Sequence, residues 1–290
     1  MNTQVRRPII GVALMLGAMA LLPGIDVLAK ILGQQGLPIL QIVWARVALG
    51  ALMTLPFACR IAGKQALWPA RPGYHIVRAG LLMLATFCFF SSLKYLPIAD
   101  ALAIFFVQPL VLTVLSALFL REKVGPHRWA AVAAGFIGTL IIIRPGLVDV
   151  NPGSWLALAS GAALACYFMM TRAISGQAHA MVTTFQTNLL GGLMLSVVIW
   201  AVWVPPTATQ WALFAALAAI ATLGHLMIVR AYDHAEASLL APLAYTEMVN
   251  SVVLGWLFFQ DFPDFWTFVG VAILIACAIY ISMRERLARP

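Results

Sequence analysis

The chain has 290 residues, of which 63% are hydrophobic and only 10% are charged. Soluble domains of this size carry about 25% charged residues, so this composition excludes a water-facing surface and indicates a polytopic helical membrane protein. The net charge of +8 would suit a nucleic-acid-binding protein, but the cations are spread over many short loops. Because scattered loop cations are typical of topology determinants, we expect no nucleic-acid partner.

Apolar runs long enough to cross a bilayer recur along the whole chain with short connections between them, which leaves no room for a soluble domain. The first run follows Arg6 and Arg7 and resembles a signal peptide, but nine more runs follow it, so we expect a retained first helix. The ten predicted spans are 9–30, 37–58, 75–93, 98–119, 126–143, 153–174, 180–202, 210–231, 236–259 and 265–283.

The distribution of Lys and Arg predicts the orientation of these spans. With the N-terminus inside, 14 of the 18 cations fall on the cytoplasmic side. Only Lys30, Lys94 and Arg144 fall on the outer side, and Arg46 lies within the second span. Since cations stay preferentially in the cytoplasm, we expect both termini there, in a multi-pass protein of the bacterial inner membrane.

The stretch from Tyr95 to Pro145 has a weaker copy that begins at Tyr232, 137 positions later. Each copy consists of a long apolar helix, a short turn with a proline and a second apolar helix. The turn is rich in cations in the first copy and has none in the second, as expected if the copies insert in opposite orientations. We therefore predict an all-α fold of two inverted five-helix repeats, 1–147 and 148–290.

Two other residue classes favour ordinary packing. Small residues four apart, Ala134 with Gly138 and Ala272 with Ala276, let helices approach closely in lipid, and a dimer contact at these spans is the alternative interpretation. The four cysteines form no CxxC pair and are expected to be reduced packing residues. Neither a metal, a cofactor nor an enzyme motif is indicated.

The chain resembles the EamA branch of the drug/metabolite transporter superfamily. The resemblance rests on the ten paired spans, on Lys30 and Arg46, and on the run LKYLPIADALAIFFVQPL…LFLREKVGPHRWAAVAAGFIGTLIIIRPG. The chain departs from the pattern after the ninth span, where that family often keeps a Glu and this chain has Gln260 and Asp261. The resemblance implies secondary transport of small organic solutes, often export of amino acids, with nucleotide sugars, triose phosphates and S-adenosylmethionine carried elsewhere in the superfamily.

Charged residues inside spans need a partner or a function, because a central charge costs about 2.5–3.5 kcal/mol on insertion scales. Asp26 and Lys30 share a helix face and form either a local ion pair or a gating and coupling site at the break favoured by Pro23. Arg46 either anchors the bundle or binds a substrate carboxylate or phosphate. Glu247 either carries a proton, pairs permanently with a cation, or is held neutral by hydrogen bonds from Tyr245 and Asn250.

Other polar and aromatic side chains fall near the middle of the spans, where a substrate cavity is expected at the interface of the repeats. Pro109 and Pro242 are expected to kink equivalent helices beside them. Packing, or anchoring at the lipid interface, is the alternative for each side chain. The predicted substrate-binding set, taken with Arg46, is Trp44, Gln108, Tyr167, Asn188, His225 and Tyr245.

The sequence favours a monomeric alternating-access exporter of small amphipathic metabolites, apolar or aromatic amino acids first, with protons as a candidate coupling ion. A second transport hypothesis is uptake or exchange of a nucleotide-type or S-adenosylmethionine-like metabolite. A hypothesis from another class is a membrane-embedded enzyme or assembly factor without transport.

Overall fold

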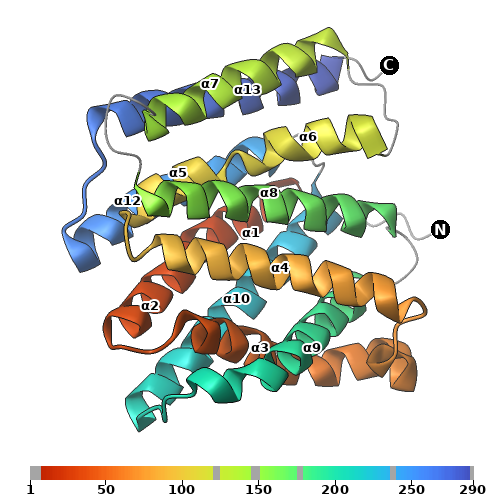
Figure 1. Cartoon of the computed structure of the whole chain (residues 1–290). Helices are drawn as coiled ribbons and strands as arrows, with labels where there is room; N and C mark the ends of the chain where they lie inside the picture. The colour runs from red at the N-terminus through yellow and green to blue at the C-terminus, as the bar shows by residue number, and fades with distance from the viewer. Residues whose placement is uncertain (1–7, 120–124, 145–150, 175–178, 236–239, 288–290) are drawn as a thin grey trace.

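The computed structural model describes residues 8–119, 125–144, 151–174, 179–235 and 240–287. Within these ranges every regular element is a helix, which confirms the all-α class (Figure 1). The helices of the first half are α1 (Pro8–Leu21), α2 (Pro23–Gln34), α3 (Ile39–Ala62), η1 (Gly63–Leu67), α4 (Pro72–Ser92), α5 (Ile98–Phe105), α6 (Gln108–Phe119) and α7 (Pro126–Ile143). Those of the second half are α8 (Pro152–Ala173), α9 (Ala180–Val198), η2 (Ile199–Val202), α10 (Ala208–His234), η3 (Ala241–Tyr245), α12 (Thr246–Phe259) and α13 (Phe265–Leu287).

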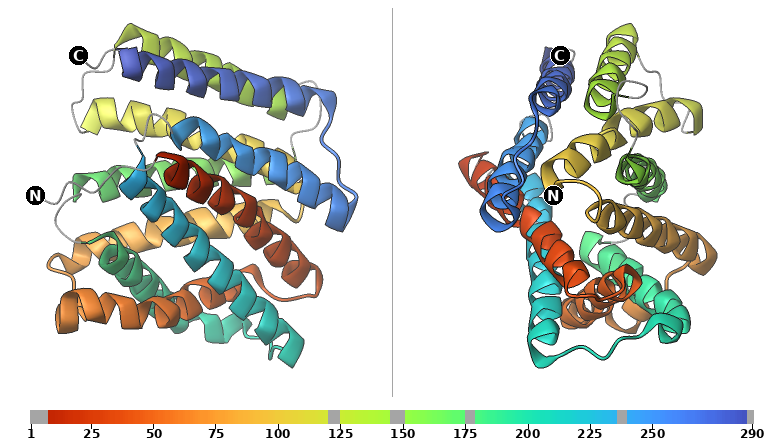
Figure 2. Two further views of the ribbon diagram at one scale, coloured as in Figure 1. Left: turned by 180° about the vertical axis from the view of Figure 1, so that it is seen from behind. Right: turned by 60° about the vertical axis from the view of Figure 1, so that its left-hand side comes forward.

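Seven of the described helical segments are long and apolar enough to cross a membrane. They coincide with the first four predicted spans and with the sixth, seventh and eighth. At the other three predicted positions lie shorter apolar helices, Trp129–Ile143, Leu243–Phe259 and Phe265–Cys277. The count of ten spans therefore stays a prediction. α1 begins and α13 ends on the same side of the bundle, which we call the terminal side (Figures 1 and 2).

Prolines interrupt two helices close to the middle of the bundle. Pro23 has no N–H to donate to the carbonyl of Met19, so the first span divides into α1 and α2 at Leu22. The Met19 carbonyl instead accepts from Asn250 Nδ2 at 3.3 Å. Pro109 likewise leaves the Phe105 carbonyl free, and the chain breaks between α5 and α6.

The freed carbonyl of Phe105 lies against Gly161 of α8. A Cβ added to Gly161 would lie only 2.7 Å from that oxygen, so glycine is required for this contact. In the second half, Pro242 stands in the 3₁₀ segment η3 directly before α12. The interruption predicted beside Pro109 is thus found, between Phe105 and Gln108, and beside Pro242 the helix is of the 3₁₀ type.

Helix contacts follow the pattern that two related halves would give. α4, the third span, packs along α8, the sixth, while α10, the eighth, packs along α1 and α2, the first. The second and seventh spans, α3 and α9, pack on each other, as do the fifth and tenth, α7 and α13. α7 and α13 run antiparallel at one edge of the bundle (Figures 1 and 2), in agreement with oppositely inserted halves.

α7 and α13 approach closely through glycines. A Cβ added to Gly270 would lie 2.6 Å from the backbone oxygen of Gly138 and 2.4 Å from Ile142 Cγ1. The predicted packing role of Gly138 is confirmed, and its contact lies within one chain. Its partner is Gly270, however, whereas Ala272 and Ala276 are exposed. Small residues therefore bring the two outer helices together.

Replacing Gly270 by alanine is expected to lower the free energy of unfolding by about 1–3 kcal/mol, because the added methyl group overpacks this crossing. Gly255→Ala is the matched control, since a Cβ there would meet its nearest atom at 3.6 Å, an ordinary contact. Thermal unfolding in detergent compares the two variants. Equal melting temperatures would contradict the close approach.

The loops at the end opposite the terminal side are joined by an ion pair. Arg144 directly follows α7 and pairs with Asp264, which directly precedes α13. Asp264 Oδ1 also accepts from the Thr267 N–H at 2.8 Å and so caps α13. Burial alone would raise the pKa of Asp264, but the hydrogen bonds from Thr267 and the nearby Arg144 outweigh it and hold this pKa below its usual value.

Candidate substrate site

A cavity of about 160 Å³ lies inside the bundle, lined by residues of α2, α3, α4, α5, α8 and α12. It therefore receives side chains from both halves of the chain. Sites for drug-sized ligands are typically about 300–1,000 Å³. In this conformation the cavity holds only part of such a molecule, so binding requires the surrounding helices to move apart.

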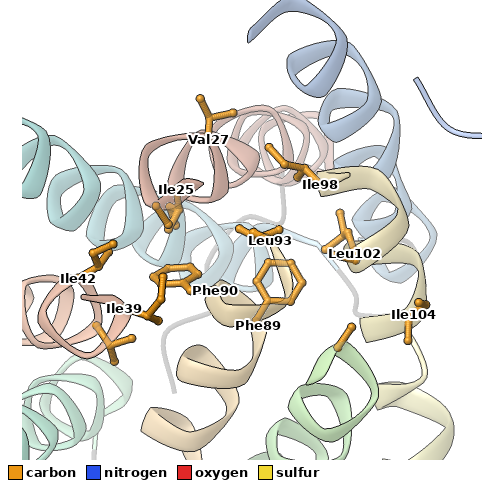
Figure 3. Packing of buried hydrophobic residues seen from close by; sticks show 14 of the residues in the cluster. Ile25, Val27, Ile39, Ile42, Phe89, Phe90, Leu93, Ile98, Leu102 and Ile104 are labelled. Carbon is orange, nitrogen blue, oxygen red and sulfur yellow. The ribbon is translucent and has the colours of Figure 1, made fainter. Parts of the chain in front are cut away.

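One side of the cavity is aromatic. Phe89 and Phe90 of α4 and Phe105 of α5 all line it. The rings of Phe89 and Phe105 are tilted, with centroids 5.0 Å apart. Figure 3 shows Phe90 directed toward α2 and α3, and Phe89 directed toward Leu102 of α5. These three side chains form an aromatic wall, which gives part of the cavity an apolar lining for a ligand.

Arg46 brings a cation from α3 into the same cavity. Its Nη1 donates to Thr86 Oγ1 at 2.8 Å, and the Thr86 hydroxyl donates in turn to the Leu82 carbonyl at 2.9 Å. Because the Thr86 proton is used in this second bond, the oxygen acts only as an acceptor toward Arg46. Thr86 therefore holds the guanidinium in place, while Nε has no hydrogen-bond partner among the described residues.

Two acids line the cavity with Arg46. Asp26 comes from α2 and Glu247 from the first turn of α12. Asp26 lies within electrostatic range of both Arg46 and Glu247. Across the described residues, however, no hydrogen bond or ion pair joins any two of the three charged groups. The cavity therefore holds one cation and two acids that are free to meet charges on a ligand.

Lys30 lies elsewhere, and the interpretation of Asp26 and Lys30 as a local ion pair is wrong. Lys30 Nζ binds Asp261 Oδ2 at 2.7 Å and lies 4.6 Å from the ring centroid of Phe259. It also donates to the Leu96 carbonyl at 3.4 Å. This contact ties α2 to the loop between α12 and α13, on the side opposite the terminal side (Figure 1).

Of the ten predicted site residues, the structure brings Asp26, Arg46 and Glu247 together at the cavity. Trp44 is directed to another part of the bundle, where Nε1 donates to Ser196 Oγ at 2.8 Å and the ring meets Trp203 edge-on at 5.5 Å. Asn188 packs against Gly50 between α9 and α3. These two residues join helices and do not line the cavity.

The four remaining predicted residues lie around the cavity without lining it. Tyr245 stacks on Phe106 with ring centroids 5.1 Å apart. Gln108 begins α6 just after the break of the fourth span. Tyr167 lies 5.5 Å from the Cζ of Arg78, and His225 of α10 has an exposed side chain within electrostatic range of Arg46.

Sequence reasoning missed the aromatic wall and the hydroxyl groups. Phe89, Phe90 and Phe105 resemble any lipid-facing phenylalanine, and nothing in the sequence distinguishes them. Thr86 and Ser160 are small polar residues inside apolar spans, which is a readable signal in a membrane. Thr86 holds Arg46, and Ser160 Oγ of α8 donates to the Ala85 carbonyl of α4 at 2.7 Å.

Comparison with known proteins places the chain among transporters. The model of the EamA-like transporter family matches it twice, over residues 9–144 and 151–283. A riboflavin transporter of Vibrio cholerae is 30% identical over 87% of this chain and 85% of its own length. An S-adenosylmethionine uptake transporter of Rickettsia prowazekii is 25% identical over 90% of this chain and 88% of its own length.

Two further comparisons concern a relative named as an exporter and a solved structure with the same fold. The pseudopaline exporter CntI of Pseudomonas aeruginosa is 26% identical over 86% of this chain and 88% of its own length. A solved crystal structure superimposes with a TM-score of 0.62 at 17% identity, covering 94% of this chain and 99% of the other. That likeness shows a common fold.

Proposed function

Because the chain belongs to the EamA-like transporter family, a group of multi-pass inner-membrane carriers, we propose that it carries an amphipathic zwitterionic metabolite through the central cavity. The cavity joins three phenylalanines to three charged groups that do not pair with one another. Charges inside a membrane protein are costly unless they are compensated. A ligand that brings complementary charges removes this cost. The proposal therefore depends on one observation, the three charged groups of the cavity that do not pair with one another.

The charge pattern selects the class of metabolite. A carboxylate fits Arg46, whose planar group binds carboxylates with two hydrogen bonds. One or two cationic groups fit Asp26 and Glu247, and an aromatic or heterocyclic portion fits the phenylalanine wall. S-adenosylmethionine has all three features: a carboxylate, two cationic groups (the ammonium and the sulfonium) and an adenine. It is our first candidate substrate, and a relative named for its uptake supports it.

Riboflavin is the second candidate. The observation that favours it is the aromatic wall of Phe89, Phe90 and Phe105, which suits a flat tricyclic ring. The 30% identity to the Vibrio cholerae riboflavin transporter supports it too. Riboflavin is uncharged, however, so it would leave all three charged groups without a charged partner.

The narrower hypothesis of amino-acid export has no named counterpart among these relatives. Apolar and aromatic amino acids share the ammonium and the carboxylate with S-adenosylmethionine and belong in the same test. For the cycle itself we propose alternating access between the halves 1–147 and 148–290, by a monomer with both termini in the cytoplasm. Roles for Trp44, Gln108, Tyr167, Asn188, His225 and Tyr245 would arise when the cavity widens.

Counterflow in proteoliposomes tests the proposal. Vesicles loaded with unlabelled solute receive trace radiolabelled S-adenosylmethionine, riboflavin or phenylalanine outside. We expect saturable counterflow of S-adenosylmethionine, inhibited by unlabelled analogues that keep its α-amino and carboxylate groups. Counterflow of riboflavin alone would favour the second candidate. Absence of flux for a broad metabolite panel, from protein that is monodisperse in detergent, would overturn the assignment and favour a membrane enzyme or assembly factor.

A further inference from the structure

Arg78 is fully buried in α4, one turn before the cavity residue Leu82 and toward the terminal side. It contacts two helices of the other half of the chain. Nη1 donates to Thr171 Oγ1 of α8 at 3.2 Å, and Nη2 donates to the Thr183 carbonyl of α9 at 3.1 Å. Nη2 also donates to Thr187 Oγ1 of α9. One side chain thus joins three helices from both halves.

No acid compensates this charge among the residues that the structure describes. The partners of Arg78 are neutral hydroxyl and carbonyl oxygens, together with the ring of Tyr167 at 5.5 Å and His75 Nδ1 at 3.5 Å. Its Nε has no partner within the described ranges. A buried ion without an opposite charge is a poor source of stability, since an apolar side chain of similar size often does as well. An ionisable group placed so deep in a membrane protein points to function.

The oxygens that accept from Arg78 have other hydrogen bonds, so Arg78 can move away from them without leaving them unsatisfied. Thr171 Oγ1 donates to the Tyr167 carbonyl at 2.8 Å, and Thr187 Oγ1 donates to the Thr183 carbonyl at 2.8 Å. Both hydroxyl protons are therefore bonded within their own helices, with or without Arg78. The Thr183 carbonyl keeps the bond from Thr187 as well. If α4 moves away, each of these three oxygens loses the bond from Arg78 but keeps its other hydrogen bond, and water entering from the terminal side would replace the lost partners of the guanidinium.

We infer that Arg78 is a positioning residue for transport that holds α4 against α8 and α9 and closes the cavity toward the terminal side. The walls that it positions carry Leu82 and Thr86 on α4 and Ser160 on α8. On the other side, Lys30 and Asp261 join α2 to the loop before α13. At the terminal side the halves are thus joined by a charge with neutral partners, whereas at the opposite end they are joined by ion pairs, Lys30 with Asp261 and Arg144 with Asp264.

Accessibility from each side tests this inference without knowledge of the substrate. In a variant whose four cysteines are replaced by serine, Leu82→Cys places one thiol in the cavity. A membrane-impermeant maleimide is applied to right-side-out and to inverted vesicles. We expect Arg78→Gln to raise the labelling rate from the terminal side roughly tenfold and to lower it from the opposite side, as a shifted two-state equilibrium requires.

Arg60→Gln is the matched control, because Arg60 lies near the end of α3 with an exposed side chain. It should leave both labelling rates unchanged. If Arg78→Gln does not yield folded protein, Arg78→Lys serves instead, since it keeps the charge but loses the planar set of donors. Equal labelling increases from both sides would show general loosening and overturn the inference, as would unchanged rates in a folded variant.

Discussion

Replacing Arg46 by glutamine is expected to lower transport of S-adenosylmethionine by roughly a hundredfold in kcat/KM, equivalent to about 3 kcal/mol. In our proposal the guanidinium binds the carboxylate of the substrate, and truncating one partner of a buried charge pair costs about 2–5 kcal/mol. Arg46→Lys should recover only part of the loss, because an ammonium cannot form the paired bonds. Initial uptake rates in proteoliposomes measure both variants.

A substrate without the carboxylate provides the control for this effect. Decarboxylated S-adenosylmethionine keeps the adenine and the sulfonium, so its transport should change little when Arg46 is replaced. Thr86→Val should lower transport of S-adenosylmethionine less than Arg46→Gln does, and again more than transport of the decarboxylated substrate, because Arg46 keeps its charge but loses the acceptor at 2.8 Å. Thr86→Ser keeps the hydroxyl and should restore transport. Equal losses for both substrates would mean that Arg46 only anchors the bundle.

Features that depend on the local chain could be predicted from the sequence. The helical class follows from apolar runs, and the interruptions at Pro23, Pro109 and Pro242 follow from the missing N–H of proline. The sequence predicts that Gly138 lies at a close helix contact, but it does not predict that the residue opposite is Gly270. Which helix faces which is decided by packing between distant segments, and this pattern of contacts is not encoded in any local window.

The site could be predicted only where burial in a membrane makes a charge conspicuous. Asp26, Arg46 and Glu247 were found in this way, and they meet at the cavity. Of the two interpretations of Asp26 and Lys30, the local ion pair is wrong, because Lys30 binds Asp261, which is distant in sequence. Arg78 is one of the 14 cations that the sequence places on the cytoplasmic side, because it lies near the start of the predicted span 75–93, yet its side chain enters the bundle and is fully buried.

Glu247 differs from the other charged groups of the cavity in one respect. Asp26 and Arg46 lie on α2 and α3 of the same half, whereas Glu247 lies on α12 of the other half. Movement of one half against the other therefore changes the distance between Glu247 and Arg46 more than the distance between Asp26 and Arg46. Moreover, the cavity holds two acids and one cation, so it has an excess negative charge when both acids are ionised. A proton bound by Glu247 would remove that excess charge.

Glu247→Gln is accordingly expected to abolish the response of net transport to an imposed proton gradient. Coupling to one proton allows about tenfold accumulation per pH unit, because one unit is worth 1.36 kcal/mol. The variant should accumulate nothing in response to the gradient, yet still exchange labelled for unlabelled substrate at a reduced rate, since exchange moves no net proton. Asp26→Asn is the matched variant and should weaken substrate affinity while retaining the response. Full gradient-driven accumulation by Glu247→Gln would show that the coupled proton binds elsewhere.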